Sequence, residues 1–403
     1  MDGRVLVTGL GAVSALGCGV PRLLEGLTSG TPGFGPIVGL PPNDLRTRIG
    51  AQVRDFDPGG LFAAKELPLL DRFSQLALVA GREAIADAGL SPAELVAAAA
   101  VVGTGCGGKE TDEETYVRLY KEGRSRAHPF TIPKGMPSAA ASQVSMGFGI
   151  QGPVFSVASA CSSAAHAIAQ AAAMIRAGLV DLALAGGTDA PFTVGLMKAW
   201  EALRVLTNDS CRPFSRDRSG IVLGEGAGML VLESEGHARR RGARVRAEMA
   251  GAGMSSDAGH ITDPSPDGAA RAMRAALADA GMAPGDIDYV NAHGTGTQAN
   301  DLAETQALHA VFGEHARRLA VSSTKSLHGH ALGASGALEA AASVLALETG
   351  VIPPTANFTE PGEGCDLDYV PNQAREAPVQ AVLSSSFAFG GLNAVLAFRA
   401  WHG

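Results

Sequence analysis

Three side chains of this 403-residue chain have the chemistry needed for acyl transfer: one cysteine and two histidines. Cys161 lies in the turn between a short apolar run and a long segment of small apolar residues, whereas His293 and His330 lie in glycine-rich turns farther along. A thiolate is a strong nucleophile, and neutral imidazoles can donate hydrogen bonds to an oxygen that gains negative charge. A cysteine with two such donors suits acyl transfer through a thioester.

The segment Val154–Gly178 predicts the element that positions the cysteine. Its pattern indicates a buried strand, a tight turn and a buried helix, with Cys161 at the turn. The N–H groups and the dipole of a helix N-terminus favour a thiolate. The arrangement parallels the nucleophile elbow of serine hydrolases, with sulfur in place of oxygen. The alternative is that Cys161 is only a small buried residue, as free cysteines often are.

The two histidines are also placed at the ends of strands. His293 lies in the turn NAHGTGT, directly after the apolar strand Ile287–Val290, and His330 precedes a helix that opens with glycines. A histidine beside a helix N-terminus tends to stay neutral and can therefore act as a hydrogen-bond donor. A single histidine among ten is more often structural than catalytic, so the signal is the pair of similar turns.

An internal repeat indicates that the chain is a fused pair of α/β units. The segment Ala80–Leu95 matches Ala272–Ile287, and the pairs Asp87/Asp279, Gly89/Gly281 and Pro92/Pro284 are each 192 residues apart. Residues Ala320–Ser326 and Gly329–Thr349 repeat the strand, turn and helix expected around Cys161. Alternating strands and helices predict mostly parallel sheets covered by helices, with sites at the C-terminal ends of the strands.

The remaining stretches predict connections and further elements. Residues Arg4–Leu10 are expected to form a strand that ends in a structural turn at Gly9–Gly11, because the glycines do not complete a dinucleotide fingerprint. Residues 28–60 are expected to be irregular, Gln75–Gly89 helical and Ala98–Gly105 a strand.

Composition limits the class of protein. Hydrophobic residues make up 46% and charged residues 18%, which indicates a well-buried fold of two or three domains or one large two-lobed unit. The net charge of −8 argues against nucleic-acid binding. Five scattered cysteines without a CxxC spacing indicate reduced thiols and no metal site, and no N-terminal span suggests a membrane, so we expect a cytoplasmic protein.

Taken together, the motifs resemble a β-ketoacyl-acyl carrier protein synthase of the Cys-His-His type, within the thiolase superfamily. The resemblance covers essentially the whole chain. It rests on SACSSAAHA around Cys161, RPFSRDRSGIVLGEGAGMLVLE from Arg212, GMSSDAGHIT from Gly253, NAHGTGTQANDLAE from Asn291, SSTKSLHGHALGASGALE from Ser322 and SSSFAFGGLN from Ser384. It implies a thiolase-like α/β fold of two duplicated halves in a five-layer αβαβα sandwich. The halves would be residues 1–245, with the cysteine, and 246–403, with the histidines.

The resemblance implies an acyltransferase that performs a decarboxylative Claisen condensation. An acyl chain on the cysteine would be joined to malonyl-acyl carrier protein and so extended by two carbons, in fatty-acid or polyketide synthesis. No cofactor is expected, because the substrates are carried on the phosphopantetheine arm of the carrier. The expected partners are acyl carrier protein and a second subunit, in a homodimer or in a heterodimer with a chain-length-factor-like subunit, without nucleic acid or membrane.

The resemblance also implies roles for individual residues. Cys161 would carry the acyl chain, while His293 and His330 bind the malonyl thioester oxygen and promote decarboxylation. The backbone N–H groups of Cys161 and Phe389 would form the oxyanion hole, and the buried Lys325 would pair with Glu339. The further implied sites are Asp301 and Glu304 as supporting acids, Thr295 and Thr297 on the phosphopantetheine arm, and Cys106, Phe387 and Phe389 at the acyl pocket and its gate.

Some positions depart from the family pattern. His328 stands where a threonine or another small residue is common, and we assign it no role. Ala388 and Leu392 replace the usual glycine and threonine of the C-terminal turn. The segment KELPLL near Lys65 supplies few of the basic residues that dock an acidic carrier. The candidates for docking are Lys65, Arg72 and Arg204.

Three related classes of protein are the alternatives. A chain-length-factor subunit shares the fold but lacks the nucleophilic cysteine, whereas Cys161 is present here. A thiolase uses coenzyme A substrates and a second cysteine near its C-terminus, and no cysteine follows Cys365. Synthases primed by acetyl-coenzyme A have an asparagine in place of one histidine. The pathway, fatty-acid or polyketide, is left open.

Overall fold

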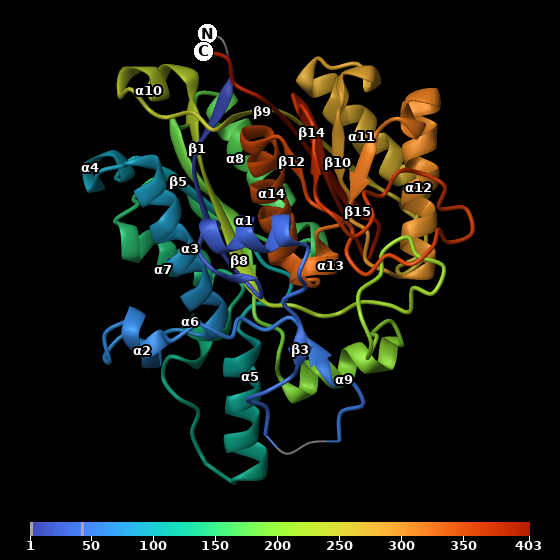
Figure 1. The fold of residues 1–403 in the computed structure, drawn as a ribbon. Coiled ribbons are helices and arrows are strands. Elements are labelled where there is room, and N and C mark those ends of the chain that lie inside the picture. Colours follow the sequence, from blue (N-terminus) through green and yellow to red (C-terminus); the bar gives the residue numbers. More distant parts are fainter. Residues whose placement is uncertain (1–2, 42–43) are drawn as a thin grey trace.

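The two halves of the chain form sheets of the same strand order. The computed structural model describes residues 3–41 and 44–403 (Figure 1). The first half contributes β1 (Val5–Ser14), β5 (Ala99–Gly103), β6 (Val154–Val157), β7 (Leu182–Asp189) and β8 (Gly226–Ser234), in the order β6-β5-β7-β8-β1. The second contributes β9 (Ala247–Ser256), β10 (Tyr289–Asn291), β11 (Ala320–Ser322), β14 (Ala381–Ala388) and β15 (Leu392–Arg399), in the order β11-β10-β14-β15-β9. The duplication expected from the sequence is therefore confirmed.

The halves join at one short antiparallel contact. Residues Val5–Val7 of β1 pair with Ala247–Met249 of β9, and β1 also pairs with the two-residue β2 (Gly17–Cys18). These strands thereby form one continuous sheet of 11 strands, with β6 and β11 at its two ends.

The sheets are mixed, which corrects the expectation of mostly parallel strands. In each half three neighbouring strands are parallel: β6, β5 and β7 in the first, and β11, β10 and β14 in the second. The remaining pairs are antiparallel. A short turn joins β14 to β15, and such a turn can connect only antiparallel strands. The parallel strands are those whose C-terminal ends precede the cysteine and the histidines.

Helices cover the strands in layers, as expected for the αβαβα sandwich (Figure 1). Helices α8 (Ser163–Arg176) and α14 (Ser335–Thr349) contact each other between the two halves, α8 packing on β5 and β7 and α14 on β8 and β14. Their many buried alanines allow this close approach. Helices α3 (Arg72–Ala88) and α7 (Ala139–Phe148) cover the outer face of the first half, and α11 (Pro266–Ala280) with α12 (Gln298–Phe312) that of the second.

The repeated residues make the same contacts in both halves. Asp87 on α3 accepts a hydrogen bond from the Leu10 N–H at 2.9 Å, and Asp279 on α11 accepts one from the Ala252 N–H at 2.8 Å. Gly89 and Gly281 end the two helices in the left-handed conformation. Each acid therefore fixes a covering helix to the first strand of its half.

The expected turn at Gly9–Gly11 is wrong, because both glycines lie within β1. A Cβ atom on Gly9 would lie 2.2 Å from the Ala84 carbonyl oxygen, and one on Gly11 would lie 1.8 Å from that of Ala80. The two glycines therefore allow α3 to pack directly on β1, and they do not form a turn.

The other elements are short and connect the layers. The irregular connection expected over residues 28–60 is confirmed for its described residues, 28–41 and 44–60, which contain only β3 (Gly35–Pro36), β4 (Ile49–Gly50) and α2 (Pro58–Leu61) after α1 (Val20–Ser29) ends. The remaining elements are η1 (Leu67–Leu69), α4 (Pro92–Leu95), α5 (Lys109–Tyr116), η2 (Val117–Lys121), α6 (Thr131–Gly135), η3 (Ala160–Ser162), α9 (Val194–Leu203), α10 (Glu235–Arg240), η4 (Pro284–Asp286), η5 (Gly313–Arg317), α13 (Lys325–His328), η6 (Leu332–Ala334), β12 (Val351–Ile352) and β13 (Arg375–Glu376). Within the described ranges no helix has the length and apolar character needed to cross a membrane.

Candidate active site

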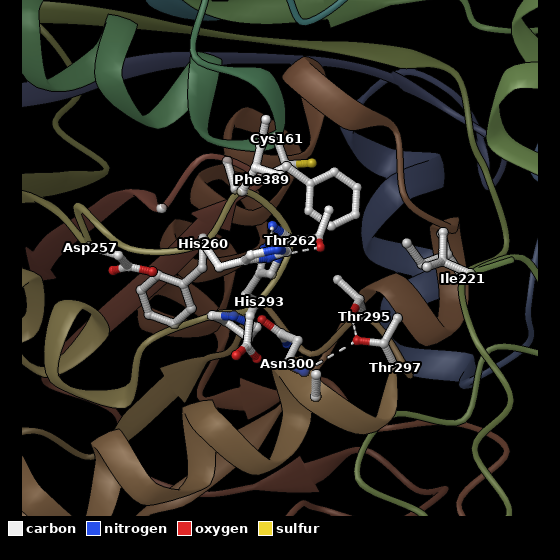
Figure 2. Close-up of a pocket in the computed structure, with 18 of the residues that line it drawn as sticks. Cys161, Ile221, Asp257, His260, Thr262, His293, Thr295, Thr297, Asn300 and Phe389 are labelled. Carbon is white, nitrogen blue, oxygen red and sulfur yellow. Dashed lines mark hydrogen bonds between the residues drawn. The ribbon is translucent and has the colours of Figure 1, made fainter. Parts of the chain in front are cut away.

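Cys161 lies at a sharp turn between β6 and α8, as the sequence predicts. The turn is the 3-10 segment η3, and Ala160 enters it with φ of 51°, in the left-handed region that residues other than glycine seldom adopt. Ser163 fixes the turn, because its hydroxyl donates to the Ala160 carbonyl at 2.7 Å and accepts from the Ser159 N–H at 2.9 Å. The thiol is buried and lines a cavity (Figure 2).

Burial opposes the thiolate that a helix N-terminus favours at Cys161. Burial raises the pKa of Cys161 to about 12, although the positive charge of Lys325 acts to lower it. Desolvation of the charged sulfur therefore exceeds the favourable effect of the helix N-terminus. Nucleophilic attack consequently requires an acceptor for the thiol proton.

Glu304 positions the His293 turn. The turn follows β10. The two carboxylate oxygens of Glu304 accept hydrogen bonds from the backbone of this turn, one from the His293 N–H at 2.8 Å and the other from the Gly294 N–H at 2.8 Å. Burial raises the pKa of Glu304 to about 7, while these two hydrogen bonds lower it. The side chain of His293 is left free: its buried Nδ1 has no partner among the described residues.

The ring of His330 is held with a defined tautomer. Its Nδ1 accepts a hydrogen bond from the Leu332 N–H at 3.2 Å and lies 3.0 Å from the Ser335 hydroxyl. Because a nitrogen that accepts from an N–H carries no proton of its own, the proton of the neutral ring is on Nε2. His330 is therefore prepared to donate a hydrogen bond from Nε2.

The two histidines lie together and are both neutral. Their ring centroids are 5.5 Å apart with an interplanar angle of 88°, and the ring centroid of Phe387 lies 5.9 Å from that of His293. Burial and the positive charge of Lys325 hold the pKa of each imidazole well below its usual value. With Cys161 they line one cavity of about 700 Å³, including its open mouth (Figure 2).

Lys325 and Glu339 form an ion pair behind the histidines. Both side chains are fully buried, and the ammonium of Lys325 donates to Glu339 Oε1. Burial raises the pKa of Glu339 to about 7, and Lys325 lowers it. The predicted pairing is present, and the positive charge of Lys325 adds to burial in lowering the pKa of both nearby imidazoles.

Thr295 and Thr297 line the cavity beyond the histidines. Their hydroxyls lie 3.0 Å apart, and Thr297 caps α12 by accepting from the Asn300 N–H at 3.3 Å (Figure 2). Asp301, in the first turn of α12, is buried and accepts from the Phe214 N–H at 2.7 Å. Burial raises the pKa of Asp301. It also accepts from the Asn300 amide at 3.2 Å and pairs with Arg218, so it supports Asn300, which lines the cavity, without lining the cavity itself.

Phe387 and Phe389 flank the nucleophile from the β14–β15 hairpin. Phe387 is buried, whereas Phe389 is half-buried in the turn and stacks on Trp200 with centroids 6.0 Å apart. Trp200, on α9, also lines the cavity and was missed in the sequence because its contact depends on a distant turn. The substituted positions Ala388 and Leu392 pair with each other at the turn end of this hairpin.

Cys106 lies beside the cavity and not among the residues that line it. It packs partly buried in an apolar cluster with Met197, Trp200 and Ile221. Burial raises the pKa of the Cys106 thiol well above its usual value. Its place in the acyl pocket stays a prediction.

The candidate docking cations differ in their environments. Lys65 and Arg204 are exposed, and Arg204 ends α9 in the left-handed conformation. The guanidinium of Arg72 binds both oxygens of the buried Glu225, at 2.7 and 2.8 Å, and lies over the Phe56 ring. Its charge is therefore paired within the fold, and its role in docking stays a prediction.

His328 has a complete set of hydrogen bonds. It is fully buried, with Nδ1 at 2.8 Å from the Gly329 carbonyl and Nε2 at 3.0 Å from the Thr324 hydroxyl. The ring therefore donates to the carbonyl from Nδ1 and accepts from the hydroxyl at Nε2. This side chain, left without a role in the sequence, braces the turn that leads to His330.

A second loop also lines the cavity. Asp257 and the segment from His260 to Pro264 line it, and Asn393 of β15 donates to Asp257 at 2.7 Å. The loop corresponds to the motif GMSSDAGHIT of the sequence. In residues 3–41 and 44–403 no three His, Cys, Asp or Glu side chains gather where they could hold a metal ion.

Comparison with known families gives one consistent match across the chain. The profile of the beta-ketoacyl synthase N-terminal domain matches residues 2–238, and that of the C-terminal domain matches residues 246–359.

Individual proteins of known name are similar over nearly the full length. Nodulation protein E of Rhizobium sp. (strain N33) is 52% identical over 401 residues, which are 99% of this chain and 100% of the relative. The 3-oxoacyl-[acyl-carrier-protein] synthase 2 of Coxiella burnetii (strain RSA 493 / Nine Mile phase I) is 43% identical over 403 residues, which cover 98% of this chain and 97% of the relative.

Two solved structures share the fold. The ishigamide ketosynthase/chain length factor superposes with a TM-score of 0.95 at 38% sequence identity. The ketosynthase of AntDE:AntF, a complex with a type II PKS acyl-carrier protein, superposes with a TM-score of 0.90 at 33% sequence identity. Each comparison covers 99% of this chain and 99% of the other.

Proposed function

The chain belongs to the beta-ketoacyl synthase family, and we propose that Cys161, His293 and His330 carry out its condensation. The reaction of the family is the condensation of an acyl chain with a substrate borne on acyl carrier protein, so the chain is an acyltransferase. The observation that supports these roles is the meeting of one thiol and two neutral imidazoles in a single cavity.

The first step is acyl transfer to Cys161. Its sulfur attacks the thioester carbonyl of the acyl carrier, the thiol proton passes to a neutral imidazole, and the pantetheine sulfur leaves and takes up that proton. The backbone N–H groups of Cys161 and Phe389, both at the cavity, stabilise the oxyanion. A proton acceptor is needed because burial keeps the resting sulfur protonated.

The second step is decarboxylation of the malonyl group. Its carboxylate leaves as CO₂, and the electron pair of the broken C–C bond passes to the thioester oxygen as an enolate. Donors from His293 and His330 stabilise that oxygen, and they can do so because the low pKa of each ring keeps it neutral. Phe387 beside His293 makes the surroundings apolar and so disfavours the charged carboxylate.

The third step forms the new carbon–carbon bond. The enolate carbon attacks the carbonyl of acyl-Cys161, and the same oxyanion hole holds the tetrahedral intermediate. The Cys161 thiolate then leaves and takes up a proton from solvent, since the first proton departed with the pantetheine thiol. The product is a β-ketoacyl chain on the carrier, two carbons longer than the primer.

The substitution Cys161→Ala tests the nucleophile. We expect no covalent acylation and no condensation, because no other thiol lines the cavity among the described residues. Cys161→Gln should also abolish condensation and leave decarboxylation of malonyl-carrier protein, since both imidazoles remain. Intact-protein mass spectrometry after incubation with acyl-carrier protein measures the first result. Acylation that persists in Cys161→Ala would show that another residue carries the acyl chain.

The partners follow as part of the proposal. The phosphopantetheine arm would lie along Thr295 and Thr297, and the acidic carrier would contact the exposed Lys65 and Arg204. Among the described residues, strand β6 pairs only with β5, and it exposes 36% of Phe155. This edge suits a second subunit, either a copy of this chain or a chain-length-factor-like protein. The similarity to the ishigamide ketosynthase/chain length factor and to AntDE:AntF supports both partners. We place the enzyme in the cytoplasm, in fatty-acid or polyketide synthesis.

A further inference from the structure

Asp189 is a fully buried carboxylate beside the active site that the proposed chemistry does not use. It ends β7 and accepts four hydrogen bonds from neighbouring turns. Oδ1 accepts from the Thr104 hydroxyl at 2.7 Å and the Cys106 N–H at 3.0 Å. Oδ2 accepts from the Gly105 N–H at 2.8 Å and the Gly333 N–H at 2.6 Å.

These four donors come from opposite halves of the molecule. Three of them belong to the turn after β5, which carries Cys106, and the fourth belongs to the turn after His330. A Cβ atom on Gly333 would lie 2.6 Å from Oδ2, so only glycine allows the carboxylate to approach this closely. The Asp189 carboxylate therefore connects the turn that carries Cys106 with the turn that follows His330.

The contact with Gly333 continues to the His330 ring. The preceding residue, Leu332, has φ of 49°, which is a strained conformation for leucine. In that conformation its N–H donates to His330 Nδ1 at 3.2 Å, and this hydrogen bond places the ring proton on Nε2. A fixed acceptor for the next N–H, such as Asp189, holds the strained residue in place.

We propose that Asp189 is a positioning residue of the condensation: it holds the His330 turn so that Nε2 donates to the substrate, and it sets the turn of Cys106 relative to it. The proposal rests on the proposed function, in which His330 stabilises the enolate. Because an ionised carboxylate only accepts hydrogen bonds, it suits four converging donors, whereas an amide of the same size brings an NH₂ group against two of them.

The substitution Asp189→Asn separates positioning from binding. We expect the turnover of malonyl-carrier decarboxylation to fall about tenfold or more, with KM changed less than about twofold, because a misplaced donor lowers the rate without removing substrate contacts. The preference among primers of increasing length should shift as well, since the Cys106 turn moves. Decarboxylation is read in the Cys161→Gln background, so that it is measured apart from acyl transfer.

A spectroscopic measurement reports the ring directly. In ¹⁵N-histidine-labelled protein, the His330 resonances are assigned by their loss in His330→Ala. We expect the parent to show a single Nε2–H tautomer and Asp189→Asn to show a mixture of tautomers. A purely structural role for Asp189 would not change this ratio in a folded protein.

Two further variants keep the inference testable. Glu233→Gln is the matched control, because Glu233 is equally buried and also accepts from a threonine, Thr8, but contacts Arg241 and not the site. It should leave the tautomer and the decarboxylation rate as in the parent. If Asp189→Asn does not fold, Thr104→Val removes one donor from the same carboxylate at nearly constant shape, and it should still shift the primer profile.

The outcomes distinguish this inference from the proposed function. If His330→Ala keeps its decarboxylation rate, the proposed function fails. If His330→Ala loses that rate while folded Asp189→Asn keeps both the rate and the tautomer of the parent, only the role of Asp189 is overturned. An unchanged primer profile in Thr104→Val, with Asp189→Asn unfolded, would overturn it as well.

Discussion

Burial sets the protonation of individual residues in this site. Cys161 stays a thiol and the histidines stay imidazoles because the cavity desolvates whichever form is charged, and Lys325 further disfavours cationic rings. The site therefore enters each cycle without a charged nucleophile or a charged donor. Charge develops during the reaction, at the enolate and the oxyanion, where the fixed donors are placed to receive it.

His328 gives this effect a measurable consequence for stability. Burial, with Lys325 nearby, lowers the pKa of His328 to about 3 in the folded protein, against its ordinary value of 6.5. The unfolded chain therefore binds this proton below pH 6.5, whereas the folded protein does not, and acidification through that range favours unfolding. Above pH 6.5 neither state binds the proton and the contribution is constant.

The substitution His328→Gln removes the titrating group. At about pH 7.5 we expect the variant to be less stable, because the hydrogen bonds with Thr324 and Gly329 are weakened. On lowering the pH to about 5.5, the parent should lose about 1.4 kcal/mol relative to the variant, since that pH is about one unit below the ordinary histidine pKa. Urea unfolding at both pH values measures the difference. A stability gap independent of pH would mean that His328 titrates normally in the folded protein.

At the scale of single elements, the sequence predicted local units better than long-range ones. The strand, turn and helix around Cys161 were predicted because their apolar pattern and small residues are contiguous. The turn at Gly9–Gly11 was wrong because a glycine that admits a neighbouring helix has the same local signature as a turn glycine.

The residues missed in the sequence act only through tertiary contacts. Asp189 has hydrogen-bond donors near position 104 and at position 333, and nothing in its own surroundings in the sequence indicates that they converge. Trp200 likewise meets Phe389 from a separate helix. The ion pair of Arg72 was missed for the same reason, because its acidic partner lies far along the chain at Glu225.

The turn of Cys106 carries a prediction about substrate length. Cys106→Phe adds an aromatic ring to the apolar cluster that contains Trp200, a residue of the cavity wall. We expect short primers to remain usable and long primers to lose turnover, by about 1–3 kcal/mol of transition-state stabilisation for each methylene that meets the filled wall. Condensation rates across primers of increasing length measure the effect. Cys106→Ser, which barely changes the volume, is the control, and an identical length profile in folded Cys106→Phe would leave Cys106 as packing only.

At the scale of the whole molecule, the duplicated halves differ at their outer edges. The edge strand of the second half, β11, forms a β-bridge from Ala320 to Asp368, so that another segment of the chain covers part of that edge. The equivalent strand β6 has no partner on its outer side among the described residues, and it leads directly into the turn of Cys161. An unpaired edge with an exposed aromatic residue is a surface that proteins usually cover. The active site therefore depends on a strand that the monomer leaves half-paired.

This asymmetry predicts a dimer built on β6. At micromolar concentration we expect the protein to sediment as a dimer, either a homodimer or a heterodimer with a chain-length-factor-like partner. We expect Phe155→Lys to sediment as a monomer, because the substitution places a charge in the buried interface. The variant should also lose condensation activity, since the turn at Cys161 follows this strand. Leu179→Lys is the matched control, because Leu179 is exposed at 69% beyond the far end of α8 and should tolerate the charge as a dimer. Analytical ultracentrifugation measures both variants, and a parent protein that is monomeric and fully active by itself would contradict the prediction.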